Sequence, residues 1–194
     1  IDEEHLALVM ADVSGKGVPA ALFMMSSKIL IIDHTLMGGT PAEILDKINK
    51  QVCSNNTVRM FVTVWLGILE ISTGKLTSSS AGHEYPFIKT NGRYEIFKDK
   101  HGFVIGGMPK LKYKEYTIDM KPGSKLFLYT DGVPEATDAE KQLFGNERMV
   151  AALNEKPDGS PQEILKTVRS SVDAFVKDAE QFDDLTMLCL EYKG

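Results

Sequence analysis

The feature that most constrains the fold is a change in hydrophobic period near residue 60. From there to about residue 130, short apolar or alternating segments such as "MFVTVWLGILEI" and "KLTSSSA" are separated by turn signals. Residues 72–74 and the pair Asn91-Gly92 predict tight hairpins, and Pro122-Gly123 joins two further strands. Because neighbouring strands with such short turns pair with each other, the pattern predicts antiparallel sheets.

Helical periodicity flanks this block on both sides. Helices are predicted over residues 19–32 and 40–52 before it, and over 145–154 and 161–178 after it. Thr40 with Glu43, and Ser160 with Glu163, have the spacing of capping boxes. Buried strands are predicted at residues 5–11 and 185–192. This order predicts an α+β fold with helices grouped outside antiparallel sheets; a single antiparallel sheet with helices on one face is the alternative.

Composition limits the classes of function. The chain has 194 residues, 43% of them hydrophobic, so one domain with one substantial core is expected over residues 1–194. A formal net charge of −5 disfavours a nucleic-acid partner. No apolar run approaches the ~18 residues of a membrane helix and no segment has a signal-peptide pattern, so a cytoplasmic protein without membrane contact is predicted. Cys53 and Cys189 are expected to be buried reduced thiols, with a disulfide as the alternative.

Three aspartates stand at the ends of predicted core strands. Asp12 follows "LALVMA", Asp131 follows "KLFLYT", and Asp183 stands just before the last strand. If the last strand runs antiparallel to the other two, the three carboxylates converge at one sheet edge. Convergent carboxylates repel one another unless a cation lies between them. Because no histidine or cysteine cluster accompanies them, zinc is disfavoured, and hard oxygen ligands predict Mg²⁺ or Mn²⁺.

Each motif also has a simpler interpretation. Asp131-Gly132 alone is typical of a turn, and Asp183-Asp184 alone is typical of a strand start. The loop "SGKG" is not a P-loop, because Met10 stands where a glycine is required and no serine or threonine follows Lys16. The coincidence of three acids at three strand ends favours a metal site, in which the neighbouring glycines let the backbone turn sharply.

Five ordered motifs then resemble a known family. "ADVSGKGVPAALFM", "SSAGHEYPF", "PGSKLFLYTDGVPEA", "LFGNERM" and "FDDLTMLCLE" occur in the order found in the SpoIIE-like branch of the metal-dependent PPM protein serine/threonine phosphatases, and they span essentially the whole chain. The resemblance implies a four-layer α-β-β-α sandwich, with two antiparallel sheets flanked by helices. It also implies hydrolysis of phosphoserine or phosphothreonine by a metal-activated water.

The resemblance assigns roles to particular residues. Asp12 resembles the carboxylate that bridges two Mn²⁺ or Mg²⁺ ions, with the Val13 carbonyl as a neighbouring ligand. Asp131 and Asp183 resemble the other acids of one metal site, and Asp184 resembles the residue that orients a ligand or a metal-bound water. The implied substrate is a small anti-anti-sigma-type phosphoprotein, and sensory or regulatory domains usually precede the catalytic domain.

Other residues have two open interpretations each. His83 is either a general acid for the leaving serine or a structural histidine at a strand turn, and the latter is favoured. Lys16 and Arg148 either meet a phosphoprotein's charge or, as the default, are solvated surface cations. Met24-Met25 is expected to belong to the core rather than to a partner groove, although the resemblance links this helix to switching.

One family motif is missing from the chain. A Gly-Asp-x-Tyr-Asp-type strand normally precedes "ADVSGKG" and contributes to the second metal site, whereas Asp2 is interpreted as a turn acid. The domain therefore looks as if it lacks its first strand, so weak or absent activity is expected of this chain. An exposed sheet edge would favour a homodimer. The competing functions are a non-catalytic phosphatase-like binding or regulatory module and a nucleotide-binding domain.

Overall fold

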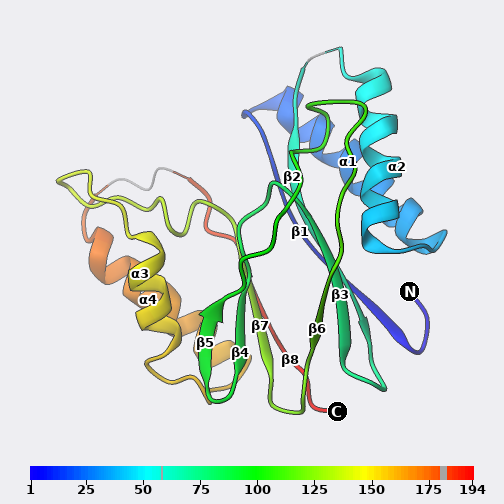
Figure 1. Cartoon of the computed structure of the whole chain (residues 1–194). Coiled ribbons are helices and arrows are strands. Elements are labelled where there is room, and N and C mark those ends of the chain that lie inside the picture. The colour runs from blue at the N-terminus through cyan, green and yellow to red at the C-terminus, as the bar shows by residue number, and fades with distance from the viewer. Residues whose placement is uncertain (58, 180–182) are drawn as a thin grey trace. The chain divides into compact units, whose positions relative to one another are not determined.

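The computed structural model describes residues 1–57, 59–179 and 183–194. The chain divides into two compact units: the first unit comprises residues 1–83, 99–119 and 194, and the second unit comprises 84–98 and 120–193. Each unit contains one four-stranded antiparallel sheet and two helices (Figure 1). The predicted α+β class, with two antiparallel sheets flanked by helices, is confirmed, and the single-sheet alternative is wrong.

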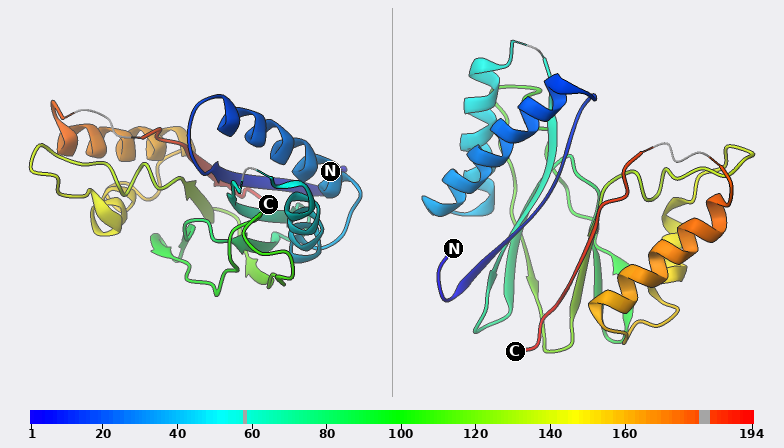
Figure 2. Two further views of the ribbon diagram at one scale, coloured as in Figure 1. Left: turned by 90° about the horizontal axis from the view of Figure 1, so that it is seen from above. Right: turned by 180° about the vertical axis from the view of Figure 1, so that it is seen from behind.

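The first unit is built on the sheet β1-β2-β3-β6. Its strands are β1 (His5–Val13), β2 (Val62–Glu70), β3 (Lys75–Ala81) and β6 (Tyr116–Asp119). Helices α1 (Val18–Leu36) and α2 (Pro41–Asn55) pack against each other, α1 against β1 and α2 against β2 and β3 (Figure 2). The core between α2 and the sheet includes Ile44, Leu45, Ile48, Val64 and Leu66, all completely buried.

The second unit is built on the sheet β5-β4-β7-β8. Its strands are β4 (Phe87–Thr90), β5 (Arg93–Ile96), β7 (Lys125–Tyr129) and β8 (Met187–Glu191). Helices α3 (Gly145–Leu153) and α4 (Pro161–Val176) pack together beside this sheet (Figure 1). Phe87, Phe127 and Tyr129 form an aromatic cluster on it, with Phe87 and Tyr129 ring centroids 5.5 Å apart.

Local chemistry explains where the elements begin and turn. The Thr40 hydroxyl accepts the Glu43 N–H while the Glu43 carboxylate accepts the Thr40 N–H, and Ser160 and Glu163 do the same for α4. Both capping boxes are therefore confirmed. Asn91 and Gly92 have φ angles of 55° and 86°, as the predicted tight hairpin between β4 and β5 requires. The predicted succession of a strand, two helices, a block of strands, two helices and a last strand is also confirmed.

The prediction that the strands around Pro122-Gly123 continue the series of hairpins is wrong. β6 pairs with β3 in the first unit, whereas β7 pairs with β4 and β8 in the second. The two strands differ in environment, because every residue of β7 is buried while β6 is largely exposed. Sheet membership is decided by which apolar face each strand completes, and a short connection does not fix that choice.

A lysine is completely buried in the second unit. Lys125 lies on β7 with 1% of its surface exposed, and its Nζ donates to the carbonyls of Pro157 (3.2 Å) and Gly159 (2.6 Å). Lys89 on β4 reaches the same turn, with its Nζ 2.5 Å from Asp158 Oδ1. These bonds satisfy cations that would otherwise be buried at high cost, and they fix the turn from which α4 begins.

Helix α1 presents apolar side chains to solvent. Six residues spaced alternately by four and three positions are between 46% and 72% exposed: Val18, Leu22, Met25, Ile29, Ile32 and Leu36. The buried residues of α1 are Ala20, Ser27, Ile31 and Thr35, so its buried side is partly polar while apolar residues remain exposed. We call these six residues the α1 stripe. The expectation that Met24-Met25 belongs to the core is wrong, since Met24 is 46% and Met25 56% exposed.

Two further sequence expectations concern thiols and membranes. Cys53 on α2 and Cys189 on β8 are both free and half-buried, so the reduced-thiol prediction is confirmed, although neither is fully buried. Among the described residues, no helix combines the length and apolar character needed to cross a membrane.

Candidate metal centre

The ends of two paired strands bring Asp131 and Asp183 to the same end of the second sheet. β7 and β8 run antiparallel, with Tyr129 opposite Met187. Beyond this pair, the Thr130 N–H donates to the Thr186 carbonyl at 3.1 Å. Asp131 follows β7 and Asp183 precedes β8, so the strand exit and the strand entrance coincide, as the sequence predicted for these two acids.

Gly132 makes the closest approach between the two segments. A Cβ atom at this buried position would lie 2.3 Å from the Asp184 carbonyl oxygen and 3.5 Å from Asp183 Cβ. Any side chain would therefore push the segment of Asp183 and Asp184 away. The glycine of the "TDG" motif thus lets the loop that carries Asp131 lie against the segment that carries Asp183.

Hydrogen bonds fix the local geometry of the acids. The Asp131 carbonyl accepts the Glu135 N–H at 2.9 Å, which closes the turn after β7. Asp183 Oδ1 accepts the Asp184 N–H at 2.7 Å, and the Thr130 hydroxyl donates to the Asp184 carbonyl at 3.4 Å. Asp131 is half-buried, whereas Asp183 and Asp184 are exposed. Phe182, the first residue of "FDDLT", lies outside the described residues.

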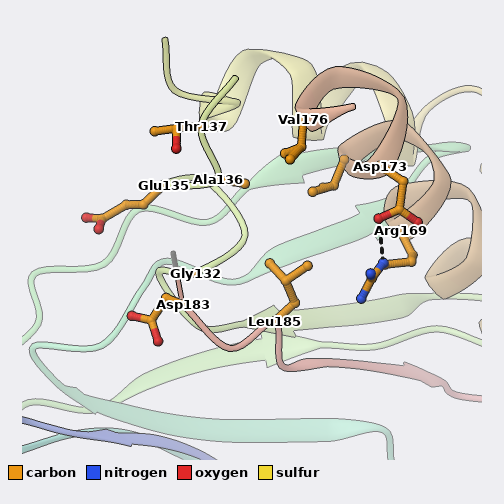
Figure 3. A pocket seen from close by; sticks show the side chains of 10 residues that line it. Gly132, Glu135, Ala136, Thr137, Arg169, Asp173, Val176, Asp183 and Leu185 are labelled. Carbon is orange, nitrogen blue, oxygen red and sulfur yellow. Dashed lines mark hydrogen bonds and ion pairs between the residues drawn. The ribbon is translucent and has the colours of Figure 1, made fainter. Parts of the chain in front are cut away.

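A pocket lies beside these acids within the second unit. Gly132 and Asp183 line one side, and Val172 and Val176 of α4 contribute apolar surface (Figure 3). On α4, Arg169 Nε donates to Asp173 Oδ1 at 2.8 Å, and both side chains line the pocket. This pair was not predicted from the sequence. Oppositely charged residues four positions apart on a helix commonly form an ion pair, so the spacing of Arg169 and Asp173 could have indicated it.

Asp12 and Val13 belong to the first unit, at the end of β1. Asp12 lies opposite Thr63 of β2, and the Thr63 hydroxyl donates to the Asp12 carbonyl at 3.4 Å. The loop then turns through Gly15 and Gly17, whose φ angles of 83° and 78° confirm that these glycines serve the backbone geometry. Lys16 between them is exposed, as the default interpretation expected.

The donor set fits a hard divalent cation, because Asp131 and Asp183 offer carboxylate oxygens from adjacent segments. The expectation that all three acids lie at the edge of one sheet is wrong, since β1 belongs to the first sheet and β7 and β8 to the second. Within the described ranges, no three His, Cys, Asp or Glu side chains form a metal-binding cluster. The convergence of Asp12 with Asp131 and Asp183, and the roles of Val13 and Asp184, stay predictions.

His83 occupies a structural environment. It is 3% exposed, and its Nδ1 lies 2.9 Å from Thr63 Oγ1. Burial of this kind favours the structural interpretation over a general acid. Asp2 accepts the Glu4 and His5 N–H groups at 2.9 and 2.8 Å, so its assignment as a turn acid is confirmed.

Arg148 is a surface cation that also makes contacts within the second unit. Its Nη1 donates to the carbonyls of Leu143 and Phe144, both at 3.1 Å. Its guanidinium carbon lies 4.5 Å from the centroid of the Phe175 ring. Arg148 is exposed, as the default interpretation expected, and it also links the loop that follows Asp131 to Phe175 of α4.

Two curated proteins are similar to this chain over almost its whole length. Phosphoserine phosphatase RsbU of Bacillus subtilis is 29% identical over 99% of this chain and 57% of its own length. Protein IcfG of Synechocystis sp. is 28% identical over 98% of this chain and 34% of its own length. The chain thus spans between about a third and three fifths of these curated relatives.

Solved structures share the fold. The SiaA-PP2C domain of Pseudomonas aeruginosa matches with a TM-score of 0.87 at 21% identity, over 100% of this chain and 78% of that one. The PP2C phosphatase domain of SpoIIE from Bacillus subtilis, solved with a fragment of its regulatory domain, matches with a TM-score of 0.82 at 18% identity, over 97% of this chain and 55% of that one. The family model described as stage II sporulation protein E (SpoIIE) matches residues 2–193, and the chain therefore belongs to the SpoIIE family.

Proposed function

We propose that this chain is a metal-dependent protein serine/threonine phosphatase domain that dephosphorylates a regulatory phosphoprotein. Membership of the SpoIIE family and the likeness to phosphoserine phosphatase RsbU support this activity. The observation that carries the proposal is the approach of Gly132 to Asp184, which holds the loops of Asp131 and Asp183 together. The close contact keeps the two acids on neighbouring segments, as binding of a shared cation would require.

Each candidate residue has a distinct task in this proposal. Asp131 and Asp183 would hold Mg²⁺ or Mn²⁺, and Asp12 and the Val13 carbonyl would act as further ligands, for two ions in all. When bound, such ions supply the positive charge that activates water and stabilises phosphoryl oxygens. Asp184 would orient a ligand. The small pocket beside Asp183, which Arg169 and Asp173 also line, would contact the part of the substrate next to the phosphoserine.

The finer proposals concern partners. The likeness to RsbU supports a small anti-anti-sigma-type phosphoprotein as the substrate. It also supports an N-terminal sensory or regulatory domain in the full-length protein. The proposed location of the protein is the cytoplasm. The α1 stripe supports a homodimer, because its seven-residue repeat matches a helix–helix seam and a second copy supplies the same stripe.

The test is release of phosphate from a phosphoserine peptide in the presence and absence of Mn²⁺. It is run on this chain and on the full-length protein. Mn²⁺-dependent release that disappears in Asp131→Asn is the expected result. A full-length protein that is folded but inactive with Mn²⁺ and with Mg²⁺ would contradict the proposal, and would favour a non-catalytic binding module instead.

A further inference from the structure

His83, Thr63 and Asp12 form a chain of two polar contacts that runs from a buried histidine to the end of β1. Thr63 lies opposite Asp12 in the β1–β2 register. Its Oγ1 is 3.4 Å from the Asp12 carbonyl oxygen and 2.9 Å from His83 Nδ1. All three residues belong to the first unit. His83 follows β3, and its backbone makes a separate hydrogen bond, in which the Ser80 hydroxyl donates to the His83 carbonyl at 3.5 Å.

The number of protons on these atoms limits the direction of the bonds. The Thr63 hydroxyl has one proton, so it can donate either to the Asp12 carbonyl or to His83 Nδ1. The two contacts exist together only if Nδ1 carries a hydrogen and donates to Oγ1. In this arrangement the imidazole donates from Nδ1 to Oγ1, and Oγ1 donates in turn to the Asp12 carbonyl.

We propose that His83 is a positioning residue, which acts through the Thr63 hydroxyl to fix the peptide group of Asp12. The inference rests on the proposed function, in which Asp12 and the Val13 carbonyl bind the metal. The contact adds to the β1–β2 pairing, which already includes Asp12 and Val13, and it favours one direction of the Asp12 peptide group and therefore of the adjoining carboxylate and carbonyl. Indirect contacts of this kind typically change metal affinity about 10–100-fold.

Variants of the two side chains separate this role from general packing. Thr63→Val keeps the shape of the side chain but removes the hydroxyl, whereas Thr63→Ser keeps it. His83→Asn places an amide donor near the position of Nδ1, whereas His83→Gln places it near Nε2. Thr77→Val is the matched control, because Thr77 lies on β3 of the same sheet and pairs with Ile68 rather than with the end of β1.

Calorimetric titration with Mn²⁺ gives the first measurement. We expect Thr63→Val and His83→Gln to bind Mn²⁺ about 10-fold more weakly or worse, and Thr63→Ser, His83→Asn and Thr77→Val to stay within about 3-fold of the wild type. Because both residues act through one contact, the double variant Thr63→Val/His83→Gln should bind no more weakly than the worse single variant. Equal affinity in all folded variants would overturn the inference.

Nitrogen-15 NMR of the imidazole gives a second measurement that needs no metal. The expected spectrum shows a hydrogen on Nδ1, and Thr63→Val should shift the Nδ1 resonance. An Nδ1 atom that carries no hydrogen would overturn the inference even where activity is normal. A wild type that binds no Mn²⁺ but shows the Nδ1 hydrogen would instead count against the proposed function, so the two failures are distinguishable.

Discussion

Gly132→Ala is the sharpest test of the candidate centre, because it adds one methyl group at the contact between the two acidic segments. The new Cβ would lie 2.3 Å from the Asp184 carbonyl oxygen, whereas ordinary contact begins at 3.4 Å. The segment of Asp183 and Asp184 must therefore move by about 1 Å. The φ angle of Gly132 is outside the left-handed region, so the strain arises from this overlap and not from the backbone conformation of alanine.

The size of the displacement sets the expected effect. A misplacement of about 1 Å in a catalytic group costs on the order of 100-fold in rate. Overpacking of this kind costs about 1–3 kcal/mol in the free energy of unfolding, which a domain of ordinary stability survives. We therefore expect a folded protein that has lost most of its Mn²⁺-dependent phosphate release and binds Mn²⁺ more weakly in calorimetry.

The matched control is Gly159→Ala. Gly159 lies in the same unit, just before α4, and its added Cβ would be 3.1 Å from the Lys156 carbonyl oxygen, a much smaller overlap. This variant should keep wild-type Mn²⁺ affinity and rate. If Gly132→Ala is folded and retains both quantities, or if Gly159→Ala loses them equally, the contact between the acidic segments has no role in the function.

Three further predictions address other parts of the molecule. Asp131→Asn should weaken Mn²⁺ binding at least about 10-fold, while the melting temperature without metal stays the same or rises because a repelling carboxylate is removed; unfolding with unchanged Mn²⁺ affinity would show that Asp131 serves only the turn. Ile29→Glu in the α1 stripe should shift a dimer to monomer in sedimentation velocity, whereas Lys28→Ala on the same helix should not; identical sedimentation of both variants and the wild type would exclude the α1 stripe as a dimer interface. Burial raises the pKa of the Asp99 carboxyl above its ordinary 3.8, with the neighbouring His101 opposing the shift, so the stability that Asp99 contributes is greatest at acidic pH and is lost as the pH rises through the raised pKa. Asp99→Asn should therefore be more stable than the wild type to urea at pH 7 but not at about pH 3, and a difference that is constant with pH would contradict this cause.

Local chemistry made much of the fold predictable. The capping residues of α2 and α4 and the Asn91-Gly92 turn satisfy neighbouring backbone groups, so the sequence contains all the information that they need. The candidate pair Asp131 and Asp183 was predictable for a related reason. Each acid adjoins an apolar strand, and antiparallel pairing of β7 with β8 necessarily brings their ends together.

Other features depend on contacts between distant residues. Whether β6 pairs with β3 or with β7 depends on which apolar face it completes, and the short connection at Pro122-Gly123 is compatible with both. Thr63 has no sequence signal at all, since its role arises only when the β1–β2 register places it opposite Asp12. The exposure of the α1 stripe could not be predicted for the same reason. An apolar repeat predicts a buried helix face, but it does not show whether another segment of the chain covers that face.

The sequence by itself therefore determined the α+β class, the order of the elements, the family and two of the acids at one sheet end. The tertiary structure decided how the strands divide between two sheets, how closely Gly132 lets the acidic segments approach, and which side of α1 meets solvent. The physical reason is range. Caps and turns are stabilised by atoms a few residues away, whereas sheet partners, close contacts and exposed faces depend on packing between segments that only the fold brings together.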